Sequence, residues 1–361
     1  MKMSDLFARP GGWLSTDDDH AIVISSRIRL ARNLDQLAFP GWGGKEECIE
    51  IWNRLRPLLC EKVPALQPAL CTGMEDVEPL DKQILLERHL ISREQMEKGA
   101  GSGLILHAGE TLSVMVNEED HLRLQCLRSG LDLAGAWAVV NQLDTEIEQV
   151  VDYAFSPELG YLTSCPTNVG TGMRASVMLH LPGLTMMEEL GPIVKGLGKI
   201  GLVVRGLWGE GTESAGNMVQ ISNQMTLGER EPDVVANIEQ IAREIIEHER
   251  NARARLMEKR QSFLEDQVGR AYGILSHARL LSSKEALDLL SGLRLGVDLG
   301  IVKKVKRAVL DELVMNVQPG HLQKFHERLL KPKERDRYRA DLVRKTLNPP
   351  PSRTRRQESP S

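Results

Sequence analysis

The chain has 361 residues, a formal net charge of −4 at pH 7 and 41% hydrophobic residues. That length accommodates a catalytic domain with a smaller second domain, and the apolar content is too high for a chain that is disordered throughout. The nearly balanced charge predicts no general affinity for nucleic acid or for an anionic membrane, so an anion site has to be a local cluster of Arg and Lys.

The five cysteines are odd in number, widely spaced and without a CxxC pair. This pattern predicts neither a disulfide framework nor a zinc site, and it favours a reducing compartment. Residues 1–16 lack the apolar core of a signal peptide, and no apolar run is long enough to span a bilayer. We therefore expect a cytoplasmic protein that does not enter a membrane.

In the first half of the chain, helical and strand-like patterns are mixed. Apolar residues at helical spacing predict helices, while alternation and β-branched runs predict strands. In chain order we expect a strand at 21–25, helices at 46–59 (with Pro57 disturbing the end), at 79–90 and from Ser92, strands at 112–116 and from Leu122, a helix at 131–152, and strands at 160–164, 175–181 and 201–205. This order lacks the regular βαβ alternation of a doubly wound sheet.

After Gly228 the pattern becomes helical. Residues 233–264 predict one long amphipathic helix, and further helical patterns follow to about residue 347. We therefore divide the chain into a short N-terminal segment (1–21), a catalytic domain (22–252), a helical C-terminal domain (253–348) and a disordered tail rich in Pro, Ser and Arg (349–361).

Two charged segments are candidates for chemistry. In SSRIRLARN, which begins at Ser25, Arg27 and Arg29 are two residues apart and share one face of an extended segment, where their guanidinium groups can clamp a phosphate. In NEEDHLR, which begins at Asn117, one of the adjacent carboxylates can accept a proton or hold a cation. The alternatives are a solvated basic edge strand and a solvated acidic turn.

Two glycine-rich segments are further candidates. Residues 164–174 combine glycines that permit close approach of a ligand with Arg174, but no Gly-Lys-Ser/Thr closes a P-loop. Cys165 in this segment is either a small buried hydrophobe or a thiolate beside a bound guanidinium. Residues 205–214 have the composition of a loop that closes over a substrate, with an ordinary surface loop as the alternative.

Together these strings resemble the phosphagen kinase, or guanidino kinase, family. The matching segments are SSRIRLARN from Ser25, ERHLIS from Glu87, NEEDHLR from Asn117, CPTNVGTGMRAS from Cys165, RGLWGEGTES from Arg205 and ISNQMTLG from Ile221. They cover roughly residues 22–250 in the family's order. The resemblance implies an α+β fold, in which a catalytic domain with a largely antiparallel sheet flanked by helices precedes a smaller all-helical C-terminal domain.

Within the family, the chain is most similar to the protein-arginine kinases. Few residues precede the first motif, where kinases of small guanidines carry a helical domain, and a helical extension follows Gly228. That extension contains a sequence similar to the RDxxRA motif of a regulatory phosphoarginine-binding pocket, formed by Arg335, Asp336, Arg337, Tyr338, Arg339 and Ala340. Without the family, a charged helix face would explain these residues.

The resemblance also assigns candidate site residues. It implies that Glu119 and Glu210 act on the guanidinium, with Glu213 as a rival for the second carboxylate, and that Cys165 is the active-site cysteine. Nucleotide-binding residues are expected at Ser25, Ser26, Arg27, Ile28, Arg29, His89, Arg123, Arg174, Ala175, Ser176, Val177, Met178, Arg205, Gly206, Leu207, Trp208, Gly209 and Glu210. Trp208 departs from the family, because kinases of small guanidines have another phosphate-binding Arg there.

The implied activity is transfer of the γ-phosphoryl group of ATP, with Mg²⁺, to arginine side chains of proteins. The alternatives are a kinase for a small free guanidino compound and a non-catalytic adaptor that binds phosphoarginine. By resemblance we also expect marking of clients for a Clp-type ATPase and protease, control of a heat-shock repressor, a small zinc-containing activator protein and a homo-oligomer. No protein-bound metal, nucleic acid or membrane partner is expected.

Overall fold

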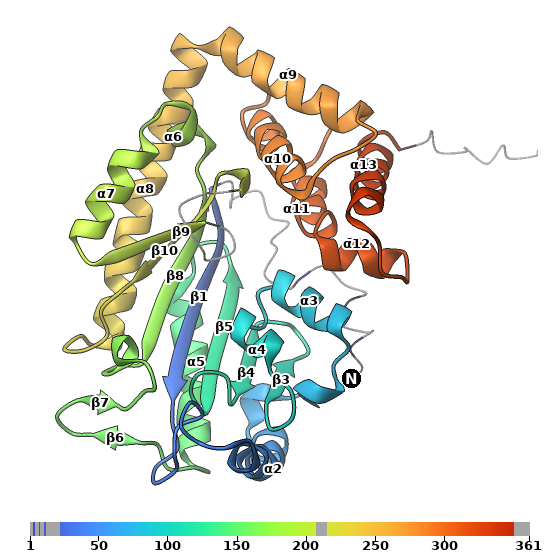
Figure 1. Ribbon diagram of the computed structural model, residues 1–361. Helices are drawn as coiled ribbons and strands as arrows, with labels where there is room; N and C mark the ends of the chain where they lie inside the picture. The colour runs from blue at the N-terminus through green and yellow to red at the C-terminus, as the bar shows by residue number, and fades with distance from the viewer. Residues whose placement is uncertain (1–2, 4–6, 8–10, 12–21, 207–214, 350–361) are drawn as a thin grey trace, which may run out of the picture. The chain divides into compact units, whose positions relative to one another are not determined.

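The computed structural model describes residues 3, 7, 11, 22–206 and 215–349 (Figure 1). The chain divides into two compact units, Met1–Leu264 and Glu265–Ser361. Most of the predicted N-terminal segment, and the predicted tail from residue 350 onward, lie outside the described residues.

An eight-stranded antiparallel sheet forms the centre of the first unit, with strand order β2-β3-β4-β5-β1-β8-β10-β9. Its strands are β1 (Val23–Arg32), β2 (Ala69–Gly73), β3 (Gly103–His107), β4 (Leu112–Val116), β5 (Leu122–Ser129), β8 (Met173–His180), β9 (Leu202–Gly206) and β10 (Met218–Asn223). A separate hairpin pairs β6 (Phe155–Ser156) with β7 (Gly160–Tyr161).

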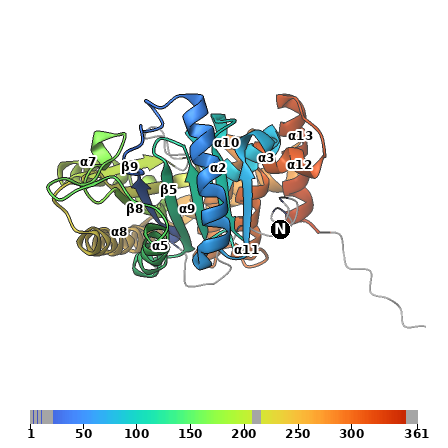
Figure 2. The ribbon, with the colours of Figure 1, turned by 90° about the horizontal axis from the view of Figure 1, so that it is seen from below.

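Three helices cover one face of this sheet: α2 (Lys45–Lys62), α5 (Leu133–Glu148) and α8 (Glu231–Lys259). Their apolar residues and those of the strands make one large core. Helices α5 and α8 lie side by side on this face (Figure 2). The remaining helices of this part of the chain are α3 (Pro79–Glu87), α4 (Arg93–Glu97), α6 (Pro182–Met186) and α7 (Leu190–Lys199). A smaller apolar cluster that includes Leu85 and Met115 lies under α3.

The alternation of side chains along each strand decides which residues face this helical layer. On β1, Ile28 and Leu30 belong to the large core, so Arg27 and Arg29 point to the opposite face. The same alternation puts Arg123 and Gln125 of β5, Arg174 of β8, Arg205 of β9 and Gln220 of β10 on that opposite face. The sheet therefore has one apolar face and one face rich in arginine.

The second unit is helical in its described residues. Its elements are α9 (Gln261–His277, which begins just before the unit boundary), α10 (Ser283–Asp298), α11 (Arg307–Asn316), α12 (Pro319–Phe325) and α13 (Pro332–Leu347). Buried leucines form most of its core, and Arg294 pairs inside it with Asp311, Nε to Oδ1 2.8 Å. No helix among the described residues has the length and apolarity that a membrane crossing requires.

The predicted fold class is confirmed: a largely antiparallel sheet with flanking helices, then a helical region. Some elements differ from their predictions. Strands β2, β3 and β10 were not predicted, Pro57 lies inside α2 without ending it, and the single helix predicted over 233–264 ends at Lys259. Proline removes only one backbone donor, and the buried face of α2 continues to Leu59 beyond it.

The expectation of no disulfide is wrong for one pair. Cys60 and Cys71 are bonded, with their Cα atoms 6.5 Å apart. The last turn of α2 packs against β2, so the chain reversal between the two elements brings these residues together. The pairing depends on tertiary packing, which the cysteine spacing alone does not reveal.

Candidate active site

Two adjoining cavities open on the arginine-rich face of the first unit, with volumes of about 300 Å³ and about 240 Å³. Five residues line both cavities: Arg29, Glu119, Arg123, Arg174 and Arg205. A group held in one cavity therefore meets a group held in the other at a boundary made of four arginines and one glutamate.

The first cavity combines charge with an apolar wall. Arg27 lines it together with Leu86, Ile91 and Met115, and His89 also contributes. Arg27 Nη2 donates a hydrogen bond of 2.7 Å to Gln220 Oε1, which holds its guanidinium group in place. A ligand with a polyanionic end and a flat, partly apolar end suits this lining.

The second cavity is smaller and is lined partly by the glycine-rich loop. Cys165, Thr167, Asn168 and Gly172 of the glycine-rich loop line it opposite Glu119. Cys165 Sγ lies 3.0 Å from Thr167 Oγ1. This cavity thus offers a carboxylate and a thiol to a bound group, the chemistry that the sequence analysis predicted for a guanidinium acceptor.

Arg27 and Arg29 of β1 are buried among other arginines. Burial, followed by the charges of Arg123, Arg174 and Arg205, lowers the pKa of Arg27 to about 10. Burial and the neighbouring arginines also hold the pKa of Arg29 well below its usual value. Arg29 Nε is buried and has no partner among the described residues. A bound anion would relieve both the mutual repulsion and the unsatisfied donor.

Arg123 differs from Arg27 and Arg29 because the charge of a carboxylate offsets its burial. Its Nη1 donates to Glu118 Oε1 at 2.5 Å, and Ser92 Oγ also donates to that oxygen. Burial disfavours the charges, but the ion pair outweighs it, so the pKa of Glu118 is lowered and that of Arg123 raised. Glu118 is therefore held as the counter-ion of Arg123 at the edge of the second cavity.

Glu119 is the exposed member of the three adjacent carboxylates. Burial of its carboxyl group in the cavity wall, together with the nearby charges of Asp120 and Glu118, raises its pKa above the usual value. A carboxylate with a raised pKa is a stronger base than a free Glu side chain, as proton abstraction from a guanidinium requires.

His89 lines the first cavity and has φ 58°. Burial and the charges of Arg27 and Arg29 lower its pKa to about 3. We expect the ring to stay neutral throughout pH 5–8 and its NMR resonances not to titrate there. Because the unfolded His protonates near pH 6.5, His89 lowers stability as the pH falls from that value toward 3. A midpoint near pH 6.5 for the His89 resonances would contradict this environment.

Among the described residues, eight of the predicted catalytic and nucleotide-binding residues line a cavity and eight do not. Ile28, Ala175 and Val177 alternate with the arginines and point into the core on the other face. Ser26 donates its hydroxyl to Gly130 O, and Ser176 donates to Arg27 O. Ser25, Met178 and Gly206 are not among the lining residues either. The predicted residues Leu207, Trp208, Gly209, Glu210 and Glu213 lie outside the described residues.

Several polar residues of the site were missed from the sequence. Gln125 and Gln220 line the first cavity beside the arginines, and Asp120 and Asn168 line the second. Asp120 Oδ1 accepts hydrogen bonds of 2.6 Å from Asn33 Nδ2 and from the backbone N–H of Ser164. The sequence could have indicated the two glutamines. Each alternates with apolar core residues along a strand, which places its polar side chain on the opposite face of the sheet, beside the arginines.

Two glycines of the loop lie in close contact with other parts of the protein. Gly170 has φ 112°, and a Cβ there would lie 2.4 Å from Thr226 O. Gly172 has φ 61°, and its Cβ would lie 2.6 Å from Ala31 O and 2.7 Å from Arg32 Nη1. These glycines therefore allow close approach of other parts of the protein, and Gly172 also lines the second cavity.

The RDxxRA-like motif lies on α13 of the second unit. Arg339 is buried, and its guanidinium donates to Val317 O at 2.8 Å, to Leu281 O at 2.7 Å and to Asp336 Oδ1 at 2.7 Å. Ala340 is also buried, whereas Arg337 is exposed and Arg335 and Tyr338 are partly exposed. The Tyr338 ring stacks on His326, with centroids 3.9 Å apart.

A comparison with known protein families identifies the class of this fold and site. The family model described as "ATP:guanido phosphotransferase, C-terminal catalytic domain" matches residues 53–252. The duplicated taurocyamine kinase from Schistosoma mansoni, solved with bound transition state analog components, is similar with a TM-score of 0.59 and 28% identity, over 69% of this chain and 36% of that one. The match therefore spans about a third of that longer chain. The class is that of the guanidino phosphotransferases.

The curated relatives narrow this class. The protein-arginine kinase of Bacillus subtilis is 47% identical over 91% of this chain and 90% of its own, and that of Halothermothrix orenii is 45% identical over 91% and 93%. The model described as "Protein-arginine kinase McsB C-terminal domain" matches residues 261–358. The chain belongs to the protein-arginine kinase family, and the resemblance inferred from its motifs is confirmed.

Proposed function

We propose that this protein transfers the γ-phosphoryl group of ATP to arginine side chains of other proteins. The observation that carries the proposal is the boundary between the two cavities. Four arginines and Glu119 line both, so a triphosphate in the first and a guanidinium in the second meet where positive charge and a base are concentrated. Phosphoryl transfer needs this combination of in-line positioning and charge stabilisation.

The arginine face fits the phosphates of a nucleotide. The depressed pKa values of Arg27 and Arg29 and the unsatisfied Nε of Arg29 support a polyanion as their missing partner. Among the described residues, no cluster of three or more His, Cys, Asp or Glu side chains offers a protein-made metal site. Mg²⁺ would then take its ligands mainly from phosphate oxygens and water, and it would neutralise charge on the transferred group.

Glu119 is the proposed base on the acceptor side. A free guanidinium is protonated and has no lone pair with which to attack phosphorus. Glu119 orients it and accepts its proton while the N–P bond forms and the bond from phosphorus to the ADP oxygen breaks. Cys165 borders the same cavity and would contact the guanidinium edge. We propose Glu210 as the second carboxylate, with Glu213 as its rival.

The direct test is incubation with ATP, Mg²⁺ and casein as an unfolded protein acceptor, followed by mapping of acid-labile phosphate by mass spectrometry. Phosphate on Arg residues of casein is the expected result. ADP formation with free arginine but none with casein would instead identify a kinase for small guanidines. Binding of phosphoarginine without any turnover would identify an adaptor and refute the enzyme.

The regulatory and cellular roles are also proposals. Arg335 and Arg337 leave cationic surface on α13 beside the packed Arg339, which supports a phosphoarginine site in the second unit. From family membership we propose homo-oligomers, a small zinc-containing activator protein, delivery of phosphorylated clients to a Clp-type ATPase, and control of a heat-shock repressor. We place this activity in the cytoplasm.

A further inference from the structure

The end of β1 carries two adjacent buried residues, Arg32 and Asn33, whose side chains reach opposite ends of the glycine-rich loop 162–172. This loop supplies Cys165, Thr167, Asn168 and Gly172 to the second cavity. Neither Arg32 nor Asn33 lines the first cavity. The two residues are therefore placed to act on the acceptor side of the site through the loop, without touching the nucleotide.

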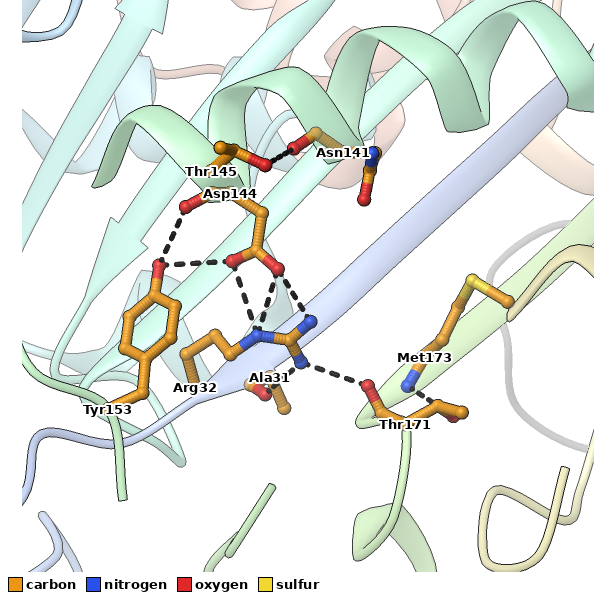
Figure 3. Close-up of polar contacts among 8 residues, drawn as sticks. All are labelled: Ala31, Arg32, Asn141, Asp144, Thr145, Tyr153, Thr171 and Met173. Atoms are coloured by element: carbon orange, nitrogen blue, oxygen red, sulfur yellow. Dashed lines mark hydrogen bonds and ion pairs between the residues drawn. The ribbon is translucent and has the colours of Figure 1, made fainter. Parts of the chain in front are cut away.

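Arg32 holds the C-terminal end of the loop (Figure 3). Its Nη1 donates to Thr171 O and to Ala31 O, both at 2.9 Å. On the other side, its Nη2 pairs with Asp144 Oδ2 of α5 at 2.7 Å, and Tyr153 donates its hydroxyl to Asp144 Oδ1 at 3.0 Å. The Tyr161 ring lies 3.5 Å from the guanidinium carbon. Arg32 is 1% exposed, so its orientation is determined by these contacts.

Asn33 holds the N-terminal end of the loop and the turn that carries Glu119. Its Nδ2 donates to Leu162 O at 3.1 Å and to Asp120 Oδ1 at 2.6 Å, while its Oδ1 accepts from the N–H of His121 at 2.8 Å. Asp120 Oδ1 also accepts from the N–H of Ser164, and the Ser164 hydroxyl donates to Glu119 O at 2.9 Å. One amide group thus links β1, the base-bearing turn and the loop beside Cys165.

We propose that Arg32 and Asn33 are positioning residues that brace both ends of the loop and so fix Cys165 and Glu119 relative to each other. The inference rests on the proposed transfer to an acceptor guanidinium. Such a brace matters for catalysis because a displacement of about 1 Å in a reacting group can lower a rate about 10²-fold. It predicts that a defect in the brace lowers acceptor turnover and leaves nucleotide affinity intact.

Asn33→Asp is the sharpest test, because it preserves the size of the side chain. It removes both N–H donors and sets a negative charge against Asp120. Tyr153→Phe is the matched control, since it loses a hydrogen bond to Asp144 on the side of the network away from the loop. We expect Asn33→Asp to lower kcat for casein phosphorylation about 10- to 100-fold, with the Kd of a fluorescent ATP analogue changed less than about threefold. Tyr153→Phe should stay within about twofold in both measurements.

Alkylation of Cys165 by iodoacetamide, followed by peptide mapping, supplies a readout independent of turnover. The rate at Cys165 should change several-fold in Asn33→Asp and remain unchanged in Tyr153→Phe, with both variants assayed well below their measured Tm. If Asn33→Asp and the unchanged protein had the same kcat and the same Cys165 reactivity, the proposed positioning role would be refuted. A fall in ATP affinity as large as the fall in kcat would refute it as well. Failure of the unchanged protein to phosphorylate casein would instead refute the proposed function.

Discussion

Replacement of Glu119 by Gln is expected to lower the rate of phosphoryl transfer about 10²- to 10⁴-fold, the usual contribution of a positioned general base. Glutamine keeps the size of the side chain and one acceptor oxygen but cannot take the proton from the guanidinium. The arginines around the first cavity are unchanged, so we expect the Kd for ATP to stay within about threefold. Single-turnover transfer to casein and titration with a fluorescent ATP analogue measure the two quantities separately.

Glu94→Gln is the matched control for this substitution. Glu94 is an exposed carboxylate that lines the first cavity only, so the same chemical change there should leave transfer within about twofold. Similar losses of rate in the two variants would mean that the carboxylate at 119 contributes only charge. Undiminished transfer by Glu119→Gln would rule it out as the base.

The same carboxylate predicts the acid side of the pH–rate profile. The base acts only when deprotonated, and burial with two neighbouring carboxylates raises its pKa. The rate should therefore fall as the pH drops through a midpoint above the value of about 4.3 for a free Glu side chain. The acid limb should disappear in Glu119→Gln. If Glu119→Gln kept an acid limb with the same midpoint, the titration of another group would control that limb.

The acidic turn illustrates what sequence could and could not predict. Three adjacent carboxylates suggested that one of them is a base, yet a solvated turn explained them equally well. The structure distinguishes them by partners elsewhere in the chain: Glu118 pairs with Arg123, and Asp120 accepts from Asn33 and from the Ser164 amide. All three line the second cavity, but only Glu119 lines both cavities. Those partners belong to other strands and loops, so no local pattern could assign them.

The arginine cluster likewise depends partly on local spacing, which the sequence shows, and partly on strand order, which it does not. Their spacing of two residues was enough to put Arg27 and Arg29 on one face of an extended segment. Their meeting with Arg174 and Arg205 depends on β8 and β10 lying between β1 and β9 in the sheet. That strand order follows from long-range packing. The motif resemblance implied that these arginines bind one nucleotide, but it did not give the order of the strands. The sequence did not predict the Cys60–Cys71 disulfide for the same reason, because the two cysteines meet only through the packing of α2 against β2.

Arg29→Met should have opposite effects on activity and stability. Arg29 lines both cavities, its Nε has no partner among the described residues, and its pKa is lowered by burial and by three neighbouring arginines. A lowered pKa in a cation means that folding disfavours the charged form, so at pH 7 the charge destabilises the free protein. Methionine fills similar space without the charge. We expect the Tm of the ligand-free protein to rise by about 2 °C or more.

The same change should nearly abolish transfer. An arginine that stabilises a transferring phosphoryl group contributes about 10³- to 10⁵-fold in rate, and loss of charge-assisted hydrogen bonds of about 1.5–3 kcal/mol weakens ATP binding roughly 10- to 100-fold. Inorganic tripolyphosphate should raise the Tm of the unchanged protein more than that of the variant, because the polyanion relieves repulsion that methionine has already removed. Calorimetry in the two conditions and a transfer assay measure these effects.

Arg32→Met is the contrasting variant, because Arg32 stands three residues further along the same strand but is paired with Asp144. Its loss leaves a buried carboxylate without a counter-ion, which costs about 3–5 kcal/mol and lowers Tm. If Arg29→Met also lowered the Tm of the ligand-free protein, the charge of Arg29 would be stabilised within the protein. The arginines of the cavities would then not need a bound polyanion to offset their repulsion. Opposite signs for the two variants would mean that β1 carries one arginine for the fold and another for the phosphate.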